Sequence, residues 1–285
     1  MAQGRQPDAR RPGGNSHPSG PQDIRYYLER LLTKAPLHRA LVRAAECRLL
    51  SERELPRPIL DIGAGDGSFA WAVFAEPPEV GIDPDGRALR EARRLGGYLS
   101  LAIGTGASLP FRDGSFASVI SNSTLEHIPD LEPVIAEMSR VLAPGGTAVI
   151  TAPSERFLDF TFGVRLFRFL RLSFLANLYR RWIARVSRHY HCDSPAVWKE
   201  RLAQAGLSLL EWRYYFSSAS TSAADIAHYT SAPSLLTKRL LGRWVLWPGK
   251  VRLLPLARWL SPLAQPGSPA TGGYLLLVCC KARPA

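Results

Sequence analysis

The 285-residue chain lacks several features that would place it in a membrane or an oxidising compartment. It has no run of 18 consecutive apolar residues, so we expect no single-pass transmembrane helix. Residues 1–22 lack the apolar centre of a signal peptide and predict a disordered tail. The four cysteines show neither Cys-x-x-Cys spacing nor a paired framework, which is typical of reduced residues in a cytoplasmic protein.

Acidic residues are also scarce. The chain has 24 Asp and Glu against 36 Lys and Arg, a net charge of +12, and no acid follows Asp225. Between Arg156 and Arg188 there are eight arginines and one acid among aromatic residues. A second segment, 217–272, combines basic residues with tryptophans: Lys238, Arg239, Arg243, Lys250, Arg252 and Arg258 with Trp244, Trp247 and Trp259.

Two segments of this kind favour an interfacial role, in which aromatic side chains enter the headgroup region and basic ones meet anionic lipid. One alternative is that their apolar faces pack on the sheet edge while the arginines are solvated. Another is nucleic acid binding, which also needs clustered positive charge. We therefore expect an anionic membrane surface as a partner, with nucleic acid as the competing one.

The stretch from Ile59 to Gly67, Ile-Leu-Asp-Ile-Gly-Ala-Gly-Asp-Gly, is the most informative of the chain. Ile59–Ile62 predicts a buried strand and Ser68–Ala75 a helix, and the glycines between them allow a sharp turn close to a ligand at the helix N-terminus. About 20 residues downstream, Asp83 ends a second predicted strand, where a carboxylate can accept both hydroxyls of a ribose. A dinucleotide-binding fold has the same pattern, so these residues alone do not choose between nucleoside cofactors.

Four later segments distinguish between these nucleoside cofactors. They follow one another in this order: Leu109-Pro-Phe-Arg-Asp-Gly-Ser-Phe116, Ala117-Ser-Val-Ile-Ser-Asn122, Leu125-Glu-His-Ile-Pro-Asp130 and Arg140-Val-Leu-Ala-Pro-Gly-Gly146. From about Pro58 to Pro153 the chain resembles the class I S-adenosylmethionine (SAM) methyltransferases, in particular the group of ubiquinone and menaquinone biosynthesis enzymes. The resemblance implies an α/β fold: a doubly wound, seven-strand Rossmann-like sheet with helical cap insertions and an antiparallel last strand. It also implies SAM as the cofactor.

The resemblance assigns cofactor positions as well. The glycine loop would cradle the methionine end of SAM, the acid after the second strand would hold the ribose, and a residue after the third strand would contact adenine. We therefore expect cofactor contacts from Asp61, Gly63, Ala64, Gly65, Gly67, Asp83, Pro84, Thr105, Gly106 and Asn122.

Two positions depart from the family pattern. The adenine-contacting residue is usually Asp but is Thr105 here, and the Phe-Asp that opens the fourth strand is Phe116-Ala117. Loss of one charge-assisted hydrogen bond would weaken adenine binding by roughly 1.5–3 kcal/mol. These departures keep a non-catalytic methyltransferase-fold protein open as an alternative.

Methyl transfer depends on positioning, with one base if the acceptor is a hydroxyl or an acidic carbon. His127, just past the fourth strand, is expected near the methyl group, although it can instead order the loop or touch the cofactor. His189 and His191 stand where relatives carry a His-x-Arg-x-x-Ser-Pro-like segment at the active-site rim. The His-x-His-Cys cluster has no second ligand cluster in the sequence, so we expect no metal site.

The domain organisation predicted from these patterns has seven parts. They are a tail (1–22), N-terminal helices (23–57), a SAM-binding core (58–153), a basic aromatic insertion (154–193), the core continued (194–216), a second cap insertion (217–272) and the last core strand with a tail (273–285). Within the core we expect a helix over Val134–Leu142, a strand over Thr147–Thr151 and a helix that begins at Ser194-Pro195.

The sequence therefore predicts a cytoplasmic SAM-dependent methyltransferase, or one peripheral on the inner face of the membrane. It would methylate oxygen or carbon of a small or amphiphilic, lipid-like acceptor. An RNA methyltransferase is the first alternative, but the fourth strand ends in Ser121-Asn122-Ser123-Thr124 rather than the Asn-Pro-Pro-Tyr of base amino-group enzymes. A methyltransferase fold with different chemistry is a further alternative.

Overall fold

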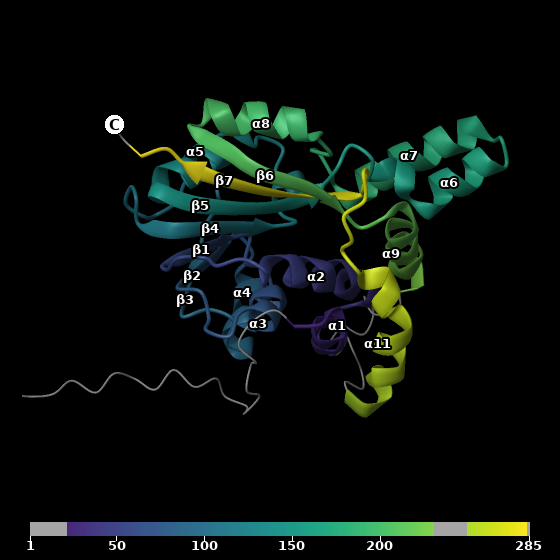
Figure 1. The fold of residues 1–285 in the computed structure, drawn as a ribbon, viewed down its shortest axis with the longest axis horizontal. Helices are drawn as coiled ribbons and strands as arrows, with labels where there is room; N and C mark the ends of the chain where they lie inside the picture. The colour runs from purple at the N-terminus through teal and green to yellow at the C-terminus, as the bar shows by residue number, and fades with distance from the viewer. Residues whose placement is uncertain (1–21, 231–249, 284–285) are drawn as a thin grey trace, which may run out of the picture.

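Seven strands form one sheet in the order β3-β2-β1-β4-β5-β7-β6 in the computed structural model, which describes residues 22–230 and 250–283 (Figure 1). The strands are β1 (Ile59–Ile62), β2 (Val80–Asp83), β3 (Ser100–Ile103), β4 (Phe116–Asn122), β5 (Leu142–Pro153), β6 (Leu207–Tyr215) and β7 (Tyr274–Lys281). The first five are parallel, and β7 runs antiparallel between β5 and β6. The predicted doubly wound sheet with an inserted antiparallel strand is confirmed.

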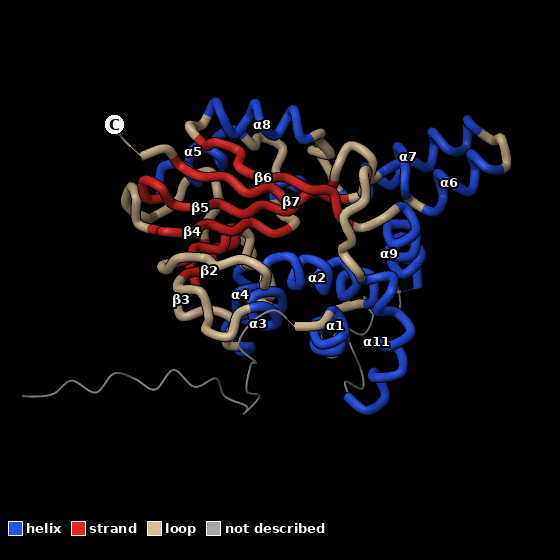
Figure 2. The backbone as a smooth tube through the Cα atoms, viewed as in Figure 1, coloured by secondary structure: helices blue, strands red, loops and turns tan. Residues whose placement is uncertain are grey.

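Helices cover both faces of this sheet (Figure 2). They are α1 (Ile24–Leu32), α2 (Leu37–Leu50), α3 (Ser68–Val73), α4 (Gly86–Leu95), α5 (Glu132–Val141) and α8 (Pro195–Gln204). Alternate residues of a strand point to opposite faces, so each buried strand serves two cores. Ile59 and Val149 pack in the layer of α1, α2 and α3, whereas Leu60 and Ile150 pack in the layer of α5 and α8.

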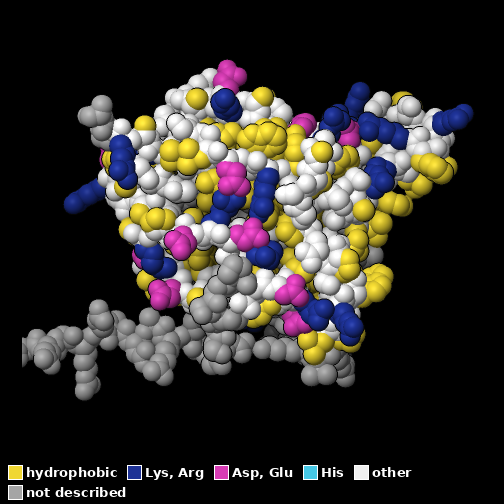
Figure 3. Space-filling view, in the orientation of Figure 1, with side chains coloured by type: hydrophobic (Ala, Val, Ile, Leu, Met, Phe, Trp, Pro, Cys, Tyr) yellow, Lys and Arg dark blue, Asp and Glu magenta, His cyan; other side chains and the backbone are white. Residues whose placement is uncertain are grey.

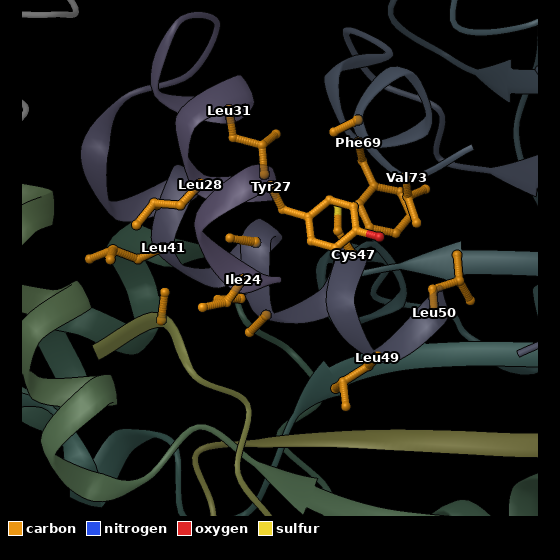
Figure 4. Close-up of a cluster of buried hydrophobic side chains, with 14 of the residues drawn as sticks. Ile24, Tyr27, Leu28, Leu31, Leu41, Cys47, Leu49, Leu50, Phe69 and Val73 are labelled. Atoms are coloured by element: carbon orange, nitrogen blue, oxygen red, sulfur yellow. The ribbon is translucent and has the colours of Figure 1, made fainter. Parts of the chain in front are cut away.

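The N-terminal helices are part of the core rather than an appendage. Tyr27, Leu31 and Leu49 are fully buried beside Phe69 of α3 (Figure 4). Complete burial of a side chain of this size stabilises the fold by roughly 1.5–3 kcal/mol. This packing fixes α2 against the sheet, and with it Arg39 and Arg43.

The cap lies at one end of the sheet. It contains the 3₁₀-helix η2 (Leu158–Phe160), α6 (Phe162–Phe169), α7 (Ser173–Ser187), α9 (Ser218–Thr230) and α11 (Lys250–Ala264). Helices α6 and α7 form a hairpin that projects away from the sheet (Figure 1). The carboxylate of Asp225 on α9 holds the base of this hairpin, because it accepts hydrogen bonds from the Phe162 backbone N–H and the Tyr179 hydroxyl, both at 2.9 Å.

Part of the second predicted insertion lies outside the described residues, including Lys238, Arg239, Arg243, Trp244 and Trp247, and so does nearly all of the predicted tail. Across the described ranges, every helix is too short or too polar to span a lipid bilayer.

Three predicted elements have bounds that differ from the structure. The helix expected over Val134–Leu142 is α5, which begins at Glu132 and ends at Val141. Strand β5 begins at Leu142 rather than Thr147, because Leu142 pairs with Phe116 across a register shift before the regular ladder starts at Thr147. The helix expected over 68–75 ends at Val73, where Phe74 adopts an extended conformation. The helix at Ser194-Pro195 is as predicted, with the Ser194 hydroxyl accepting from the Val197 N–H.

Candidate functional site

The carboxyl ends of β1, β2, β3 and β4 meet at one edge of the sheet, and the strand order reverses between β1 and β4. A reversal of this kind leaves a crevice where α/β folds bind ligands. The glycine loop after β1 lies there. A Cβ on Gly63 would stand 2.2 Å from the Thr124 side chain, so the close approach of the loop to β4 requires glycine. Gly65 has a φ of +54° with open space beside it.

A small pocket, here called the glycine pocket, lies over this loop. Its lining consists of Arg39, Arg43, Asp61, Gly63, Ala64, Gly65, Asp66, Ser68, Phe69 and Asn122. The Tyr98 hydroxyl donates to Oδ2 of Asp61 at 2.6 Å, while Oδ1 of Asp61 is buried without a hydrogen-bond partner. Burial raises the pKa of the Asp61 carboxyl to about 6. A ligand that brings a hydrogen-bond donor or a positive charge fits this acceptor, and the amino end of SAM has both.

The expected ribose and adenine positions lie along the same edge. Asp83 accepts from the Gly65 N–H at 2.9 Å and the Asp85 N–H at 2.8 Å, and each carboxylate oxygen keeps a lone pair for a further donor. Pro84 and Thr105 are exposed beyond β2 and β3. Gly106 has no room for a side chain, since a Cβ would stand 2.9 Å from Val134.

Gly67 and Asn122, also expected to contact the cofactor, have structural partners. Gly67 caps α3 in the left-handed conformation. The Asn122 amide donates to Glu46 at 2.8 Å and accepts from the Thr151 hydroxyl at 2.8 Å, while its backbone carbonyl accepts from Arg43. Asn122 therefore lines the glycine pocket with its side chain already hydrogen-bonded on both sides.

A second and larger cavity of about 300 Å³, here called the histidine cavity, adjoins the first. Arg39 and Arg43 of α2 line both, so the two spaces are neighbours that share these arginines. Four of the six histidines of the chain line the larger one. Its walls are His38, Arg39, Val42, Arg43, Ser123, Glu126, His127, Phe157, Ile183, Val186, Ser187, His189, Thr221, Ala224, Asp225, His228 and Tyr274.

His127 and His189, two of the three expected catalytic histidines, come together in this cavity. Their ring centroids are 5.0 Å apart, and Nδ1 of His127 lies 3.2 Å from the Arg188 carbonyl oxygen. Burial lowers the pKa of His189 to about 3 and also lowers the pKa of His127, so both imidazoles are neutral near pH 7. The neighbouring Glu126 carboxyl is buried, which raises its pKa to about 8.

His191, the third, lies apart from them. Its Nε2 is 3.0 Å from the Ile128 carbonyl oxygen, its Nδ1 is 3.0 Å from Arg201, and it lines neither cavity. The structure thus gives His191 protein partners on both ring nitrogens and brings it into neither space.

Several lining residues were not found from the sequence. Arg39 and Arg43 precede the recognised motifs, and Glu126, which follows the fourth strand, is only 2% exposed. The buried network of Glu46, which joins Arg43, Asn122 and Tyr215, was also missed. The sequence did offer a signal for Glu46. It is a charged residue among the apolar residues of a predicted helix, and α2 buries it together with Ala45 and Cys47.

Comparison with known proteins identifies the domain. Residues 60–150 match a family model described as a methyltransferase domain. An uncharacterized methyltransferase of Mycobacterium sp. (strain KMS) is 43% identical over 98 residues, which cover 33% of this chain and 38% of that protein. Norajmaline N-methyltransferase of Rauvolfia serpentina is 32% identical over 115 residues, covering 36% and 38%. The matches thus span less than two fifths of the relatives' length.

Solved structures share the fold over most of the chain. A SAM-dependent methyltransferase from Thermotoga maritima aligns with 90% of this chain and 99% of its own at a TM-score of 0.53 and 17% identity. The cyclase SpnF aligns with 87% of this chain and 82% of its own at a TM-score of 0.53 and 19% identity. These structures show the fold. The family match and the related sequences make residues 60–150 a SAM-dependent methyltransferase domain, with SAM as its cofactor.

Proposed function

We propose that the chain transfers the methyl group of SAM to an oxygen or carbon atom of a small amphiphilic acceptor held in the histidine cavity. The observation that carries this proposal is the pair of arginines shared by the two spaces, since it sets an acceptor-sized cavity directly beside the glycine pocket. SAM supplies an electrophilic methyl group when bound. The protein then has to hold an acceptor in line with it and handle the acceptor's proton.

The lining of the histidine cavity suits an acceptor that is partly apolar. Val42, Phe157 and Ile183 offer apolar contacts, while His127 and His189 present neutral imidazole nitrogens to a polar group. A neutral imidazole can accept a hydrogen bond from a hydroxyl or take its proton. We expect SAM to be held by Asp61 and Gly65 in the glycine pocket and by Asp83, which accepts a hydrogen bond from the Gly65 N–H.

A direct test follows the methyl group. Purified protein with tritium-labelled SAM is incubated with a lipid and metabolite extract of cells that lack the gene, and label is counted in the organic and aqueous phases. We expect transfer into an organic-phase product with wild type and none with Gly65→Arg. Label in an amine product would replace oxygen or carbon with nitrogen as the acceptor atom. Absence of any labelled product together with tight SAM binding would contradict the proposal.

We further propose that the α6–α7 hairpin contacts an anionic membrane surface. Phe169 and Phe174 are 84% and 77% exposed, and Leu178, Trp182 and Val186 leave an apolar stripe of α7 uncovered. Arginines alternate with these residues, and Figure 3 shows basic side chains at the end of the hairpin beside hydrophobic ones. Apolar insertion combined with positive charge is what an anionic bilayer surface binds.

Vesicle co-sedimentation tests this second proposal. Binding should rise with the fraction of anionic lipid and fall with salt, because the Debye length is only about 10 Å at 0.1 M. RNA is added as a competitor in a parallel series. Weak binding to all vesicles with tight, salt-sensitive binding to RNA would favour the RNA alternative.

A further inference from the structure

A carboxylate and two imidazoles meet in the wall of the histidine cavity although they come from distant parts of the chain. Glu126 and His127 lie on the 3₁₀-helix η1 (Leu125–His127), and His189 follows α7. One ligand-type atom from each residue lies within 4.8 Å of the other two. The backbone fixes this meeting, since the Tyr190 N–H donates to the Glu126 carbonyl oxygen at 2.8 Å.

Two atoms of this cluster are buried without a hydrogen-bond partner. They are Oε2 of Glu126 and Nδ1 of His189. A buried polar atom without a partner is destabilising, so two in one cluster need an explanation. Arg43 lines the same cavity, but its guanidinium donates to Glu46 at 3.0 Å and to the Asn122 carbonyl oxygen at 2.7 Å. A cation bound by both atoms would satisfy them together.

The His127 imidazole, the third group of the cluster, is oriented by a backbone contact. Nδ1 of His127 lies 3.2 Å from the Arg188 carbonyl oxygen, so Nδ1 carries the hydrogen and donates it. Nε2 of His127 then has a free lone pair, and this atom lies 3.9 Å from Oε1 of Glu126. A carbonyl that fixes the tautomer of a histidine in this way is the usual outer support of a metal ligand.

We propose that Glu126, His127 and His189 bind one divalent transition-metal ion, with the remaining coordination positions open to the histidine cavity. Two imidazoles and one carboxylate suit zinc and iron(II), and sites with three protein ligands keep a position for substrate. Ligand atoms around a metal with bonds of about 2.0–2.2 Å lie roughly 3–3.5 Å apart. The three ligand atoms lie within 4.8 Å of one another here, so the side chains have to close in on the ion when it binds.

The existence of this site does not depend on the proposed methyl transfer, but its role does. If the acceptor carries an oxygen, that atom can take an open coordination position and be held beside the glycine pocket. The metal would then orient the acceptor, and the two imidazoles would serve as ligands rather than as bases. The sequence-based expectation of no metal site concerned His189, His191 and Cys192, whereas the structure pairs His189 with Glu126 and His127.

Metal binding is tested on the full-length, untagged protein after treatment with a chelator. Zn²⁺ is titrated against a chromophoric competitor, and Co²⁺ is added separately to record its visible spectrum. We expect one equivalent of each metal, with Co²⁺ bands that indicate nitrogen and oxygen ligands. Glu126→Gln, His127→Gln and His189→Gln should each weaken Zn²⁺ binding at least tenfold.

His191→Gln is the matched control, because it removes a histidine of the same segment that lies outside the cavity. It should keep wild-type Zn²⁺ affinity. Circular dichroism and affinity for S-adenosylhomocysteine show whether each variant is folded, and His127→Gln, at the most exposed ligand, remains informative if the buried Glu126 variant unfolds.

Less than one equivalent of Zn²⁺, or equal losses in His189→Gln and His191→Gln, would overturn the metal site. Stoichiometric, His189-dependent Zn²⁺ binding by a protein that binds no SAM would instead refute the proposed function and leave the metal site standing.

Discussion

The glycine pocket and the histidine cavity share Arg39 and Arg43 but are built in different ways. The glycine pocket takes most of its lining from one run, residues 61–69, at the ends of neighbouring parallel strands. The histidine cavity takes its lining from α2, η1, α7, α9 and β7, which are spread between residues 38 and 274. One is a local motif, and the other exists only because distant segments pack together.

This difference has a consequence for substitution. A change in the glycine loop acts on a few adjacent backbone atoms and should affect the cofactor alone. A change in the cap acts on surfaces that several helices form together. It should affect acceptor binding or membrane binding and leave SAM affinity intact.

Gly65→Arg should have the largest effect and abolish SAM binding, because the side chain would fill the open space beside the loop. Gly96→Arg is the control, since Gly96 has a similar positive φ with no atom near its Cβ position and lies at the end of α4. Isothermal titration calorimetry with SAM and its demethylated product measures both. Retained binding by Gly65→Arg would break the assignment of the glycine pocket.

The double variant Phe169→Ser/Phe174→Ser should weaken vesicle binding at least tenfold. Each of these exposed Phe side chains would contribute roughly 1.5–3 kcal/mol to binding when it becomes buried in the bilayer. The salt dependence should remain, since the arginines are unchanged. Leu210→Ser/Trp212→Ser removes two exposed apolar residues of β6 and serves as the control. Equal vesicle binding by the two double variants would contradict a role of the hairpin in membrane binding.

Asp83→Ala should weaken SAM binding by about 1.5–3 kcal/mol through the loss of charge-assisted hydrogen bonds to the ribose. Asp113→Ala, which removes an exposed carboxylate paired with Arg140, should leave the affinity unchanged. Calorimetry at matched pH and salt compares them. Equal affinities would mean that the ribose is held elsewhere.

The raised pKa of the buried Asp61 carboxyl should make the stability of the fold depend on pH. Burial raises the pKa of this carboxyl from 3.8 to about 6, so the folded state binds more protons than the unfolded state between these values. Stability should therefore fall as pH rises through this window, by up to about 3 kcal/mol at 1.36 kcal/mol per pKa unit. Asp61→Asn removes this contribution. Urea unfolding of both proteins at pH 4 and pH 6.5 should show the smaller decrease in the variant, and parallel profiles would contradict the expectation.

Thr105→Asp should have the smallest effect and tighten SAM binding by about 1 kcal/mol, because a carboxylate accepts from the adenine amino group more strongly than a hydroxyl. Thr105→Asn, with a neutral acceptor at the same place, should give a smaller gain. Unchanged or weaker affinity in Thr105→Asp would show that this loop does not meet the adenine.

Much of the fold could be predicted because its signals are local. The strand over Ile59–Ile62 and the Ser194 cap of α8 came directly from apolar runs and turn chemistry. The early start of β5 could not be predicted, because Leu142 becomes part of the strand by pairing with Phe116, a tertiary contact. The separation of His189 from His191 was equally hidden. Their segment is irregular, so no helical or strand period tells which way each imidazole points.

The sequence by itself determined the doubly wound sheet and the cofactor edge, because glycine loop, acidic residue and strand ends follow each other within a short stretch whose geometry is set by backbone conformation. Only the tertiary structure decided what faces that edge. The packing of α2 makes Arg39 and Arg43 part of the lining of both spaces, and the return of the chain after α7 brings His189 to Glu126 and His127. Such contacts depend on how separate apolar faces pack, which no local pattern records.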